Sequence, residues 1–175
     1  MNKILFSGPP GAGKTTAIAA VSDVPVVSTE QKATDAVKAM KEATTVAMDY
    51  GQISVEGGKV HLYGTPGQKR FDYMWNILSK GAVGLVLLMS NTSADPLQEL
   101  EEYVSAFRDF VNETDLVVGV TRMDEAPRPG LRSYQERLQS LGLNVPVVEV
   151  DARAPEDIRT LLMLLLTMLD PTVKR

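Results

Sequence analysis

Cysteine is absent from the 175 residues of the sequence. Its absence excludes disulfide bonds, thiolate zinc sites and cysteine nucleophiles, and also prenyl and palmitoyl anchors, which are attached to cysteine. Asn2 excludes N-myristoylation, because that modification requires glycine at the second position. We therefore expect no direct membrane anchor.

Long apolar runs are absent too. The most apolar segment, 158–169, covers about 12 residues, whereas a membrane-spanning helix needs about 20. No N-terminal stretch resembles a signal peptide, and the net charge of −4 gives no electrostatic reason to expect nucleic acid as a partner. These features predict a cytoplasmic protein, and the length fits a single domain over residues 1–175.

A phosphate-binding pattern is present near the start of the chain. Residues 8–15 read Gly-Pro-Pro-Gly-Ala-Gly-Lys-Thr, after an apolar strand-like run and before a helix-like segment. The glycines let backbone N–H groups point into an anion-sized concavity, and a helix starting near Lys14 adds its positive end. Lys14 can reach the β- and γ-phosphates, and the Thr15 hydroxyl can bind Mg²⁺. The alternative, a glycine-rich turn that binds nothing, does not explain the complete motif in this context.

Strand-like and helix-like segments alternate along the rest of the chain. This pattern predicts an α/β fold of the P-loop NTPase type: a three-layer sandwich with a mostly parallel six-stranded sheet, one antiparallel edge strand and helices on both faces. Expected strands cover 4–6, 45–55, 59–64, 82–90, 116–120 and 145–150, and expected helices cover 14–21, 70–79, 96–111, 131–141 and 155–169. Ligands bind beyond the carboxyl ends of strands in such sheets, and the distinctive segments 8–15, 64–68, 121–124 and 151–153 all follow strands.

The order and spacing of these segments resemble those of the Ras-like small GTPases over essentially the whole chain. Residues 44–51, Thr-Thr-Val-Ala-Met-Asp-Tyr-Gly, and 64–68, Gly-Thr-Pro-Gly-Gln, are similar to a bacterial branch that includes MglA and the conservon GTPases. The resemblance implies a slow GTPase that binds GTP or GDP with Mg²⁺ and acts as a molecular switch in signalling or polarity. It also implies protein regulators or effectors of the roadblock/LC7 type.

Residues 121–124, Thr-Arg-Met-Asp, resemble the guanine-reading motif of that family. Asp124 would accept two parallel hydrogen bonds from the ring N–H and amine of guanine, a pair that adenine does not offer. Arg122 departs from the usual lysine and could stack on the base through its planar guanidinium. In residues 151–153, the Ala152 backbone N–H would meet the base oxygen. An acidic residue that caps an ordinary turn remains the alternative for Asp124.

The resemblance also assigns the remaining roles. Thr45, with Thr44 as the competing choice, would complete the Mg²⁺ shell, and Gln68 would orient the attacking water. Pro10 would crowd the route of a partner's arginine, which implies slow hydrolysis. The expected nucleotide contacts are Gly8, Pro10, Gly11, Ala12, Gly13, Lys14, Thr15, Thr16, Thr45, Gly67, Thr121, Arg122, Asp124, Ala152 and Arg153.

Gly64 departs from the family, which usually has an aspartate there that holds an Mg²⁺-bound water. Either Mg²⁺ binding is weaker, or Asp49 supplies the carboxylate and joins Thr15 and Thr45 at the metal. With Gly57-Gly58 as the tight turn, Gly64 lies opposite Gly51 and Asp49 is a diagonal neighbour about 7–8 Å away. Members of the Arf branch slide this hairpin by two residues, which would bring Asp49 opposite Gly64 in one state only.

Two other functions remain open at this point. A P-loop ATPase or small-molecule kinase would use the same phosphate loop, although the sequence shows no arginine-rich lid. A binding module that holds nucleotide with little turnover would also fit Gly64, Pro10 and the loose guanine motif.

Overall fold

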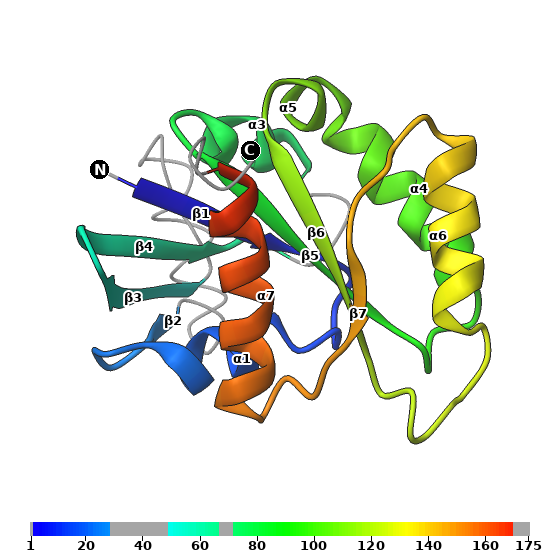
Figure 1. Ribbon diagram of the computed structural model, residues 1–175, viewed down its shortest axis with the longest axis horizontal. Coiled ribbons are helices and arrows are strands. Elements are labelled where there is room, and N and C mark those ends of the chain that lie inside the picture. The colour runs from blue at the N-terminus through cyan, green and yellow to red at the C-terminus, as the bar shows by residue number, and fades with distance from the viewer. Residues whose placement is uncertain (1, 29–48, 67–71, 170–175) are drawn as a thin grey trace.

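The computed structural model describes residues 2–28, 49–66 and 72–169. Its sheet is built from β1 (Asn2–Ser7), β2 (Val27–Ser28), β3 (Asp49–Val55), β4 (Gly58–Gly64), β5 (Gly84–Ser90), β6 (Asp115–Thr121) and β7 (Val147–Glu149). The strand order is β2-β3-β4-β1-β5-β6-β7 (Figure 1). From β4 to β7 all neighbouring strands are parallel, while β3 is antiparallel to β4 and β2 to β3.

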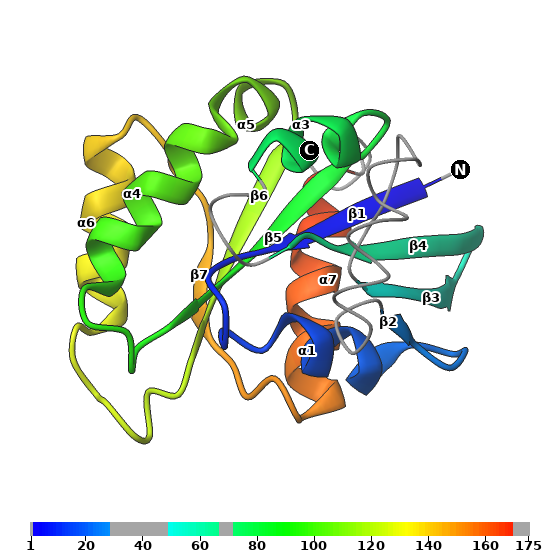
Figure 2. The same cartoon turned by 180° about the vertical axis from the view of Figure 1, so that it is seen from behind.

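Helices cover both faces of this sheet (Figures 1 and 2). They are α1 (Lys14–Val21), α3 (Asp72–Ser79), α4 (Pro96–Ala106), α5 (Arg108–Glu113), α6 (Leu131–Ser140) and α7 (Pro155–Leu169). One apolar cluster joins α1 and α7 to the sheet, and the other joins α3, α4, α5 and α6 to the opposite face. The expected three-layer α/β sandwich is confirmed.

Local sequence explains most of these boundaries. Every residue of β5 is buried, as expected for a strand covered on both faces. Asp95 caps α4 by accepting a hydrogen bond from the Gln98 backbone N–H at 3.2 Å, and Pro96 occupies the first turn, where no N–H is needed. The helix expected over 96–111 is interrupted at Phe107 (φ −101°, ψ 15°), whose buried ring stacks on Trp75 with centroids 5.2 Å apart.

The sheet has seven strands rather than the expected six, because a short extended piece joins its edge. Val27 pairs with Tyr50 and Ser28 with Asp49. The sequence suggests only a brief extended piece over 24–28, and its place in the sheet depends on the hairpin beside it. The edge is therefore β2, and β3 lies inside the sheet.

The β3–β4 hairpin has a different frame from the expected one. Val55 pairs with Gly58, so the loop consists of Glu56 and Gly57, and Gly57 has the positive φ of 99°. Asp49 therefore lies directly opposite Gly64, and the expected diagonal placement was wrong. The observed pairing differs by two residues from the expected one, and it is the register in which the sequence analysis placed Asp49 opposite Gly64. A difference of two residues keeps each side chain on its expected face.

Among the described helices, none combines the length and the apolar character that crossing a bilayer would require.

Candidate nucleotide-binding site

The loop between β1 and α1 packs closely against two neighbouring segments. Gly8 has φ 144°, and a Cβ there would lie 2.0 Å from the Leu88 carbonyl oxygen of β5. Gly13 has φ 101°, and its Cβ would lie 2.8 Å from the Ala152 Cβ. Both positions need glycine for conformation and for space. The fold of the loop thus depends on the glycines that the motif supplies.

Lys14 holds its ammonium group across this loop. The side chain is 8 % exposed, and Nζ donates to the carbonyl oxygens of Gly8 at 2.7 Å and Pro9 at 2.8 Å. Gly13 is the N-cap residue of α1, so the helix begins where the loop ends. A positive side chain and the positive end of a helix converge here, an arrangement that favours phosphate.

The segment after β4 is anchored beside the same loop. The Thr65 hydroxyl donates to the Ser7 hydroxyl at 2.8 Å, and both side chains are buried. The Trp75 indole N–H donates to the Pro66 carbonyl oxygen at 3.0 Å. Residues 64–66 are thereby tied to β1 on one side and to α3 on the other.

Asp49 and Thr15 are hydrogen-bonded to each other at the start of α1. The Thr15 hydroxyl donates to Asp49 Oδ2 at 2.8 Å, and Asp49 is 2 % exposed. Its other oxygen, Oδ1, is the one buried side-chain polar atom of the described chain without a hydrogen-bond partner. A Cβ at Gly64 would lie 2.9 Å from Oδ2, so glycine leaves the space that this carboxylate occupies.

These residues fit a magnesium ion. Mg²⁺ commonly takes one or two protein oxygens and completes its shell with waters and phosphate oxygens. A buried carboxylate with an unsatisfied oxygen beside a threonine hydroxyl provides such a partial shell. Within the described ranges, no group of three or more His, Cys, Asp or Glu side chains is placed to hold a metal ion.

A cavity of about 710 Å³ extends from the phosphate loop to the ends of β6 and β7. Its walls include Ala12, Gly13, Thr16, Thr121, Arg122, Asp124, Ala152 and Arg153, all of which the sequence analysis singled out. Asp124 is exposed on this wall. The Thr121 hydroxyl donates to the Ala12 carbonyl oxygen at 3.1 Å and to that of Met89 at 3.3 Å, so it joins β6 to the phosphate loop.

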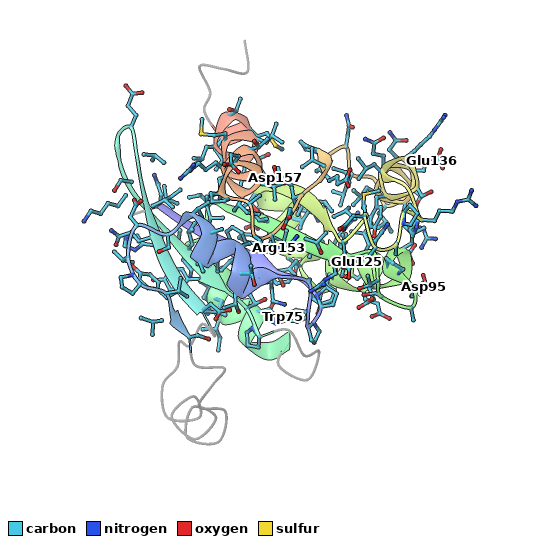
Figure 3. The ribbon with its side chains drawn as sticks, turned by 90° about the horizontal axis from the view of Figure 1, so that it is seen from below. Trp75, Asp95, Glu125, Glu136, Arg153 and Asp157 are labelled. Carbon is cyan, nitrogen blue, oxygen red and sulfur yellow. The ribbon has the colours of Figure 1, made fainter. Side chains whose placement is uncertain are left out.

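Two arginines line the cavity, and each forms an ion pair with an acidic residue. Arg122 has the left-handed φ of 61°, and its guanidinium contacts Glu125 at 3.2 Å. Arg153 forms a fork on Asp151 with distances of 3.0 and 2.9 Å. The side-chain and backbone hydrogen bonds from Arg153 lower the pKa of Asp151 to about 2. Figure 3 looks at this end of the molecule and labels Glu125, Arg153 and Asp157 around the cavity.

The structure describes most of the residues expected at the site, but not all of them. Thr45, Gly67 and Gln68 lie outside the described residues. Pro10 is exposed on the phosphate loop. Sequence reasoning missed Asn91, whose side chain holds the loop after β6, and Tyr134, whose hydroxyl donates to Asn91. The available signal was a polar residue directly after the buried β5, at the edge where ligands bind.

The fold and this site define a nucleotide-binding protein of the P-loop type. The chain belongs to the family described as "Conserved hypothetical ATP binding protein", whose sequence model matches residues 25–170. The matched range begins after the phosphate loop and covers the hairpin and all later elements.

Two curated relatives match shorter stretches. Uncharacterized protein MJ1339 of Methanocaldococcus jannaschii is 34% identical over 79 residues, covering 41% of this chain and 51% of the relative. Ras-related protein SEC4 of Candida albicans is 26% identical over 121 residues, covering 66% of this chain and 57% of that protein. The matches thus span little more than half the length of these relatives.

Two solved structures share the fold. The bacterial selenocysteine-specific elongation factor EF-Sec aligns with a TM-score of 0.68 at 18% identity, over 97% of this chain and 30% of that one. The cytosolic domain of the T. maritima FeoB iron transporter, in its GMPPNP form, aligns with a TM-score of 0.62 at 19% identity, over 95% of this chain and 63% of that one. At such identities the likeness shows the fold alone.

Proposed function

We propose that the protein binds GTP and GDP with Mg²⁺, hydrolyses GTP slowly and acts as a molecular switch. The observation that carries this proposal is a cavity whose walls include Gly13 and Thr16 of the phosphate-loop region together with Asp124 and Ala152. A nucleotide needs one site for its phosphates and another for its base. We infer that this cavity holds the base and extends to the phosphate loop.

The base end supports guanine. Asp124 is an exposed carboxylate on the cavity wall, available to accept two hydrogen bonds from a guanine edge. A site built to make such bonds rejects ligands that lack them, because its polar groups would be left unpaired. Arg122 and Arg153 flank this end and are placed to contact the base or ribose.

The phosphate end supports Mg²⁺. Thr15 and Asp49 would hold the ion, with Thr45 as a further ligand, and Mg²⁺ would neutralise charge on the phosphate oxygens. Asp49 belongs to β3, whereas Gly64 occupies the β4 position where Ras-like proteins usually have a carboxylate. The carboxylate of this chain is therefore proposed to come from the neighbouring strand.

Turnover is proposed to depend on Gln68, which would orient the attacking water. Pro10, exposed on the phosphate loop, would make hydrolysis slow by limiting access for an arginine from a partner. The resemblance to MglA-like and conservon GTPases suggests a role in bacterial signalling or polarity, with roadblock/LC7-type regulators. A cytoplasmic location is part of the same proposal.

ATP binding is the second candidate, because the description of the family names ATP. In that case Asp124 would lack its pair of donors, and adenine would need other contacts in the cavity. A nucleotide-holding module with little turnover is the third candidate. It would use the same cavity without a role for Gln68.

Titration calorimetry of nucleotide-stripped protein with GDP, GTP and ATP, with and without Mg²⁺, tests the assignment. We expect tight binding of both guanine nucleotides, strengthened by Mg²⁺, and rejection of ATP. Binding of ATP at similar affinity would contradict the guanine assignment. Hydrolysis by wild type and Gln68→Ala then separates a GTPase from a holding module, since equal rates would favour the module.

A further inference from the structure

Asn91 lies directly after β5 and is 3 % exposed. Its position places it beside the end of β6, where the loop that carries Asp124 begins. The backbone N–H of Asn91 donates to the Thr121 carbonyl oxygen at 3.0 Å. The main chain of Asn91 therefore contacts the first residue of this loop.

The Asn91 side chain binds the other end of the same loop. Its Nδ2 group donates to the Ala126 carbonyl oxygen at 2.8 Å and to the Pro129 carbonyl oxygen at 2.8 Å. Thr121 and Ala126 enclose Asp124, so Asn91 contacts the chain on both sides of the base-reading residue. Asp124 itself is exposed, and none of these bonds uses its carboxylate.

Tyr134 of α6 fixes the orientation of this amide. Its hydroxyl donates to Asn91 Oδ1 at 2.5 Å, and the Tyr134 ring is fully buried. Burial, with a further contribution from Glu99, raises the pKa of Tyr134 well above its usual range, so the hydroxyl remains a donor. With Tyr134 as the donor, Oδ1 is the acceptor and both Nδ2 hydrogens face carbonyl oxygens.

Among side chains of this size, only asparagine satisfies that environment. An aspartate could accept from Tyr134, but it has no hydrogens for the two carbonyl oxygens. An alanine would remove the partner of the Ala126 and Pro129 carbonyl oxygens and would leave the buried Tyr134 phenol without its acceptor, which costs stability. Every polar atom of the Asn91 side chain is thus hydrogen-bonded: Nδ2 holds the loop, and Oδ1 accepts from Tyr134 of α6.

We propose that Asn91, oriented by Tyr134, is a positioning residue that sets the discrimination between guanine and other bases by holding the 121–130 loop. This inference rests on the proposed function, since it assumes that Asp124 reads the base. Two parallel hydrogen bonds require the carboxylate to keep one orientation. A loop released from Ala126 and Pro129 would let Asp124 sample others, and discrimination would fall before phosphate binding does.

The test compares GDP with IDP, whose base lacks the exocyclic amine that Asp124 would bind. Kd values for GDP, IDP and inorganic pyrophosphate are measured by calorimetry for wild type, Asn91→Ala, Asn91→Asp and Tyr134→Phe, together with thermal stability. Thr114→Val serves as the matched control, because it removes a side-chain hydrogen bond to Phe110 at the opposite end of β6. Pyrophosphate reports on the phosphate loop alone.

Wild type should bind GDP about 10- to 100-fold more tightly than IDP, the range expected for one hydrogen bond to a charged group. In both Asn91 variants the ratio of GDP affinity to IDP affinity should fall close to one, with pyrophosphate binding unchanged. Tyr134→Phe should reduce the same ratio several-fold. Thr114→Val should keep the wild-type ratio.

A folded Asn91→Ala or Asn91→Asp protein with the wild-type GDP-to-IDP ratio would overturn the inference, and so would parallel losses of pyrophosphate and GDP binding. If neither Asn91 variant folds, a wild-type GDP-to-IDP ratio in Tyr134→Phe would overturn the inference instead. A wild type that binds GDP and IDP equally would instead refute guanine reading itself, and the role of Asn91 would fall with it.

Discussion

Asp49 of β3 lies directly across the ladder from Gly64 of β4, and its carboxylate fills the space where a side chain at 64 would be. Asp49 Oδ2 also accepts a hydrogen bond from Thr15 at 2.8 Å, while Oδ1 has no partner among the described atoms. A buried carboxylate with one unsatisfied oxygen costs stability. We infer that this cost is retained because the oxygen serves a metal ion.

Substitution of Gly64 by alanine tests the space that Asp49 needs. The added methyl group would lie 2.9 Å from Asp49 Oδ2 and 3.2 Å from Ile18 Cδ1, so it would displace the carboxylate. We expect a loss of about 1–3 kcal/mol in the free energy of unfolding and a weaker effect of Mg²⁺ on nucleotide affinity. Chemical denaturation and calorimetry measure the two effects.

Gly130→Ala is the control for that substitution. Gly130 has φ −78°, and nothing lies within 4 Å of a Cβ built there. Its stability should remain within about 0.5 kcal/mol of wild type. If Gly64→Ala were equally harmless and kept the full effect of Mg²⁺, the space at residue 64 would have no role in the site.

Asp49→Asn tests the carboxylate directly. The variant keeps the size of the side chain but removes the charge that would hold the metal, so the strengthening of GTP binding by Mg²⁺ should fall about 10- to 100-fold. Stability of the nucleotide-free protein should be unchanged or higher, because a buried, half-satisfied charge is removed. Affinities with Mg²⁺ and with a chelator give the first quantity, and thermal unfolding gives the second.

Asp23→Asn is the matched control, since Asp23 also accepts a hydrogen bond, from the Ser54 backbone N–H at 2.6 Å, but is exposed. It should leave the effect of Mg²⁺ unchanged. An equal effect of Mg²⁺ in Asp49→Asn and wild type would remove Asp49 from the metal site.

Tyr103 and Tyr134 should titrate later than ordinary tyrosines. Burial raises the pKa of both phenols, with further contributions from Glu99 and, for Tyr103, Glu102. The raised folded-state pKa means that their contribution to stability is complete below the unfolded value of about 10 and is lost as pH rises through the folded values. The free energy of unfolding should therefore decrease above about pH 10.

Ultraviolet difference absorbance of tyrosinate checks this expectation. Of the five tyrosines, Tyr103 and Tyr134 should ionise only at higher pH or on unfolding, and burial also raises the pKa of Tyr63. Tyr134→Phe should remove one of these late-titrating groups. Ionisation of all five near the ordinary pKa in a folded protein would contradict the burial of these phenols.

Much of the fold follows from local sequence. The expected bounds of α1 and α7 match the structure, because Pro25 prevents a longer α1 and Pro155 suits a first helical turn. The apolar runs at β5 and β6 predict central strands. The carboxyl ends of such strands are the edge of the sheet where ligands bind, so the sequence also predicts the position of the site. Ala12, Thr121, Asp124 and Ala152 meet at one cavity as expected.

The errors occurred where the outcome depends on contacts between distant segments. Two adjacent glycines allow two frames for the β3–β4 turn, and packing of the hairpin selects Gly57 as the loop residue. The pairing of Val27 with Tyr50 depends on a strand that is distant in sequence. The break at Phe107 accompanies its stacking on Trp75, which periodicity does not reveal.

Asn91 is the clearest example of a site residue that local sequence could not predict. No motif marks it, and its importance arises from three partners, Ala126, Pro129 and Tyr134, that are more than thirty residues away in sequence. Only the folded chain brings them together around one amide.

The most direct test of the account is the base preference of Asp124→Asn, measured with GDP and XDP by calorimetry. Xanthine has an oxygen where guanine has its amine, so an amide at residue 124 can donate to it. Wild type should bind GDP and reject XDP. The Asp124→Asn variant should lose affinity for GDP and gain affinity for XDP. Glu125→Gln, a neutralised acid in the same loop, should keep the wild-type preference. Unchanged GDP binding by Asp124→Asn would contradict the claim that this loop reads guanine.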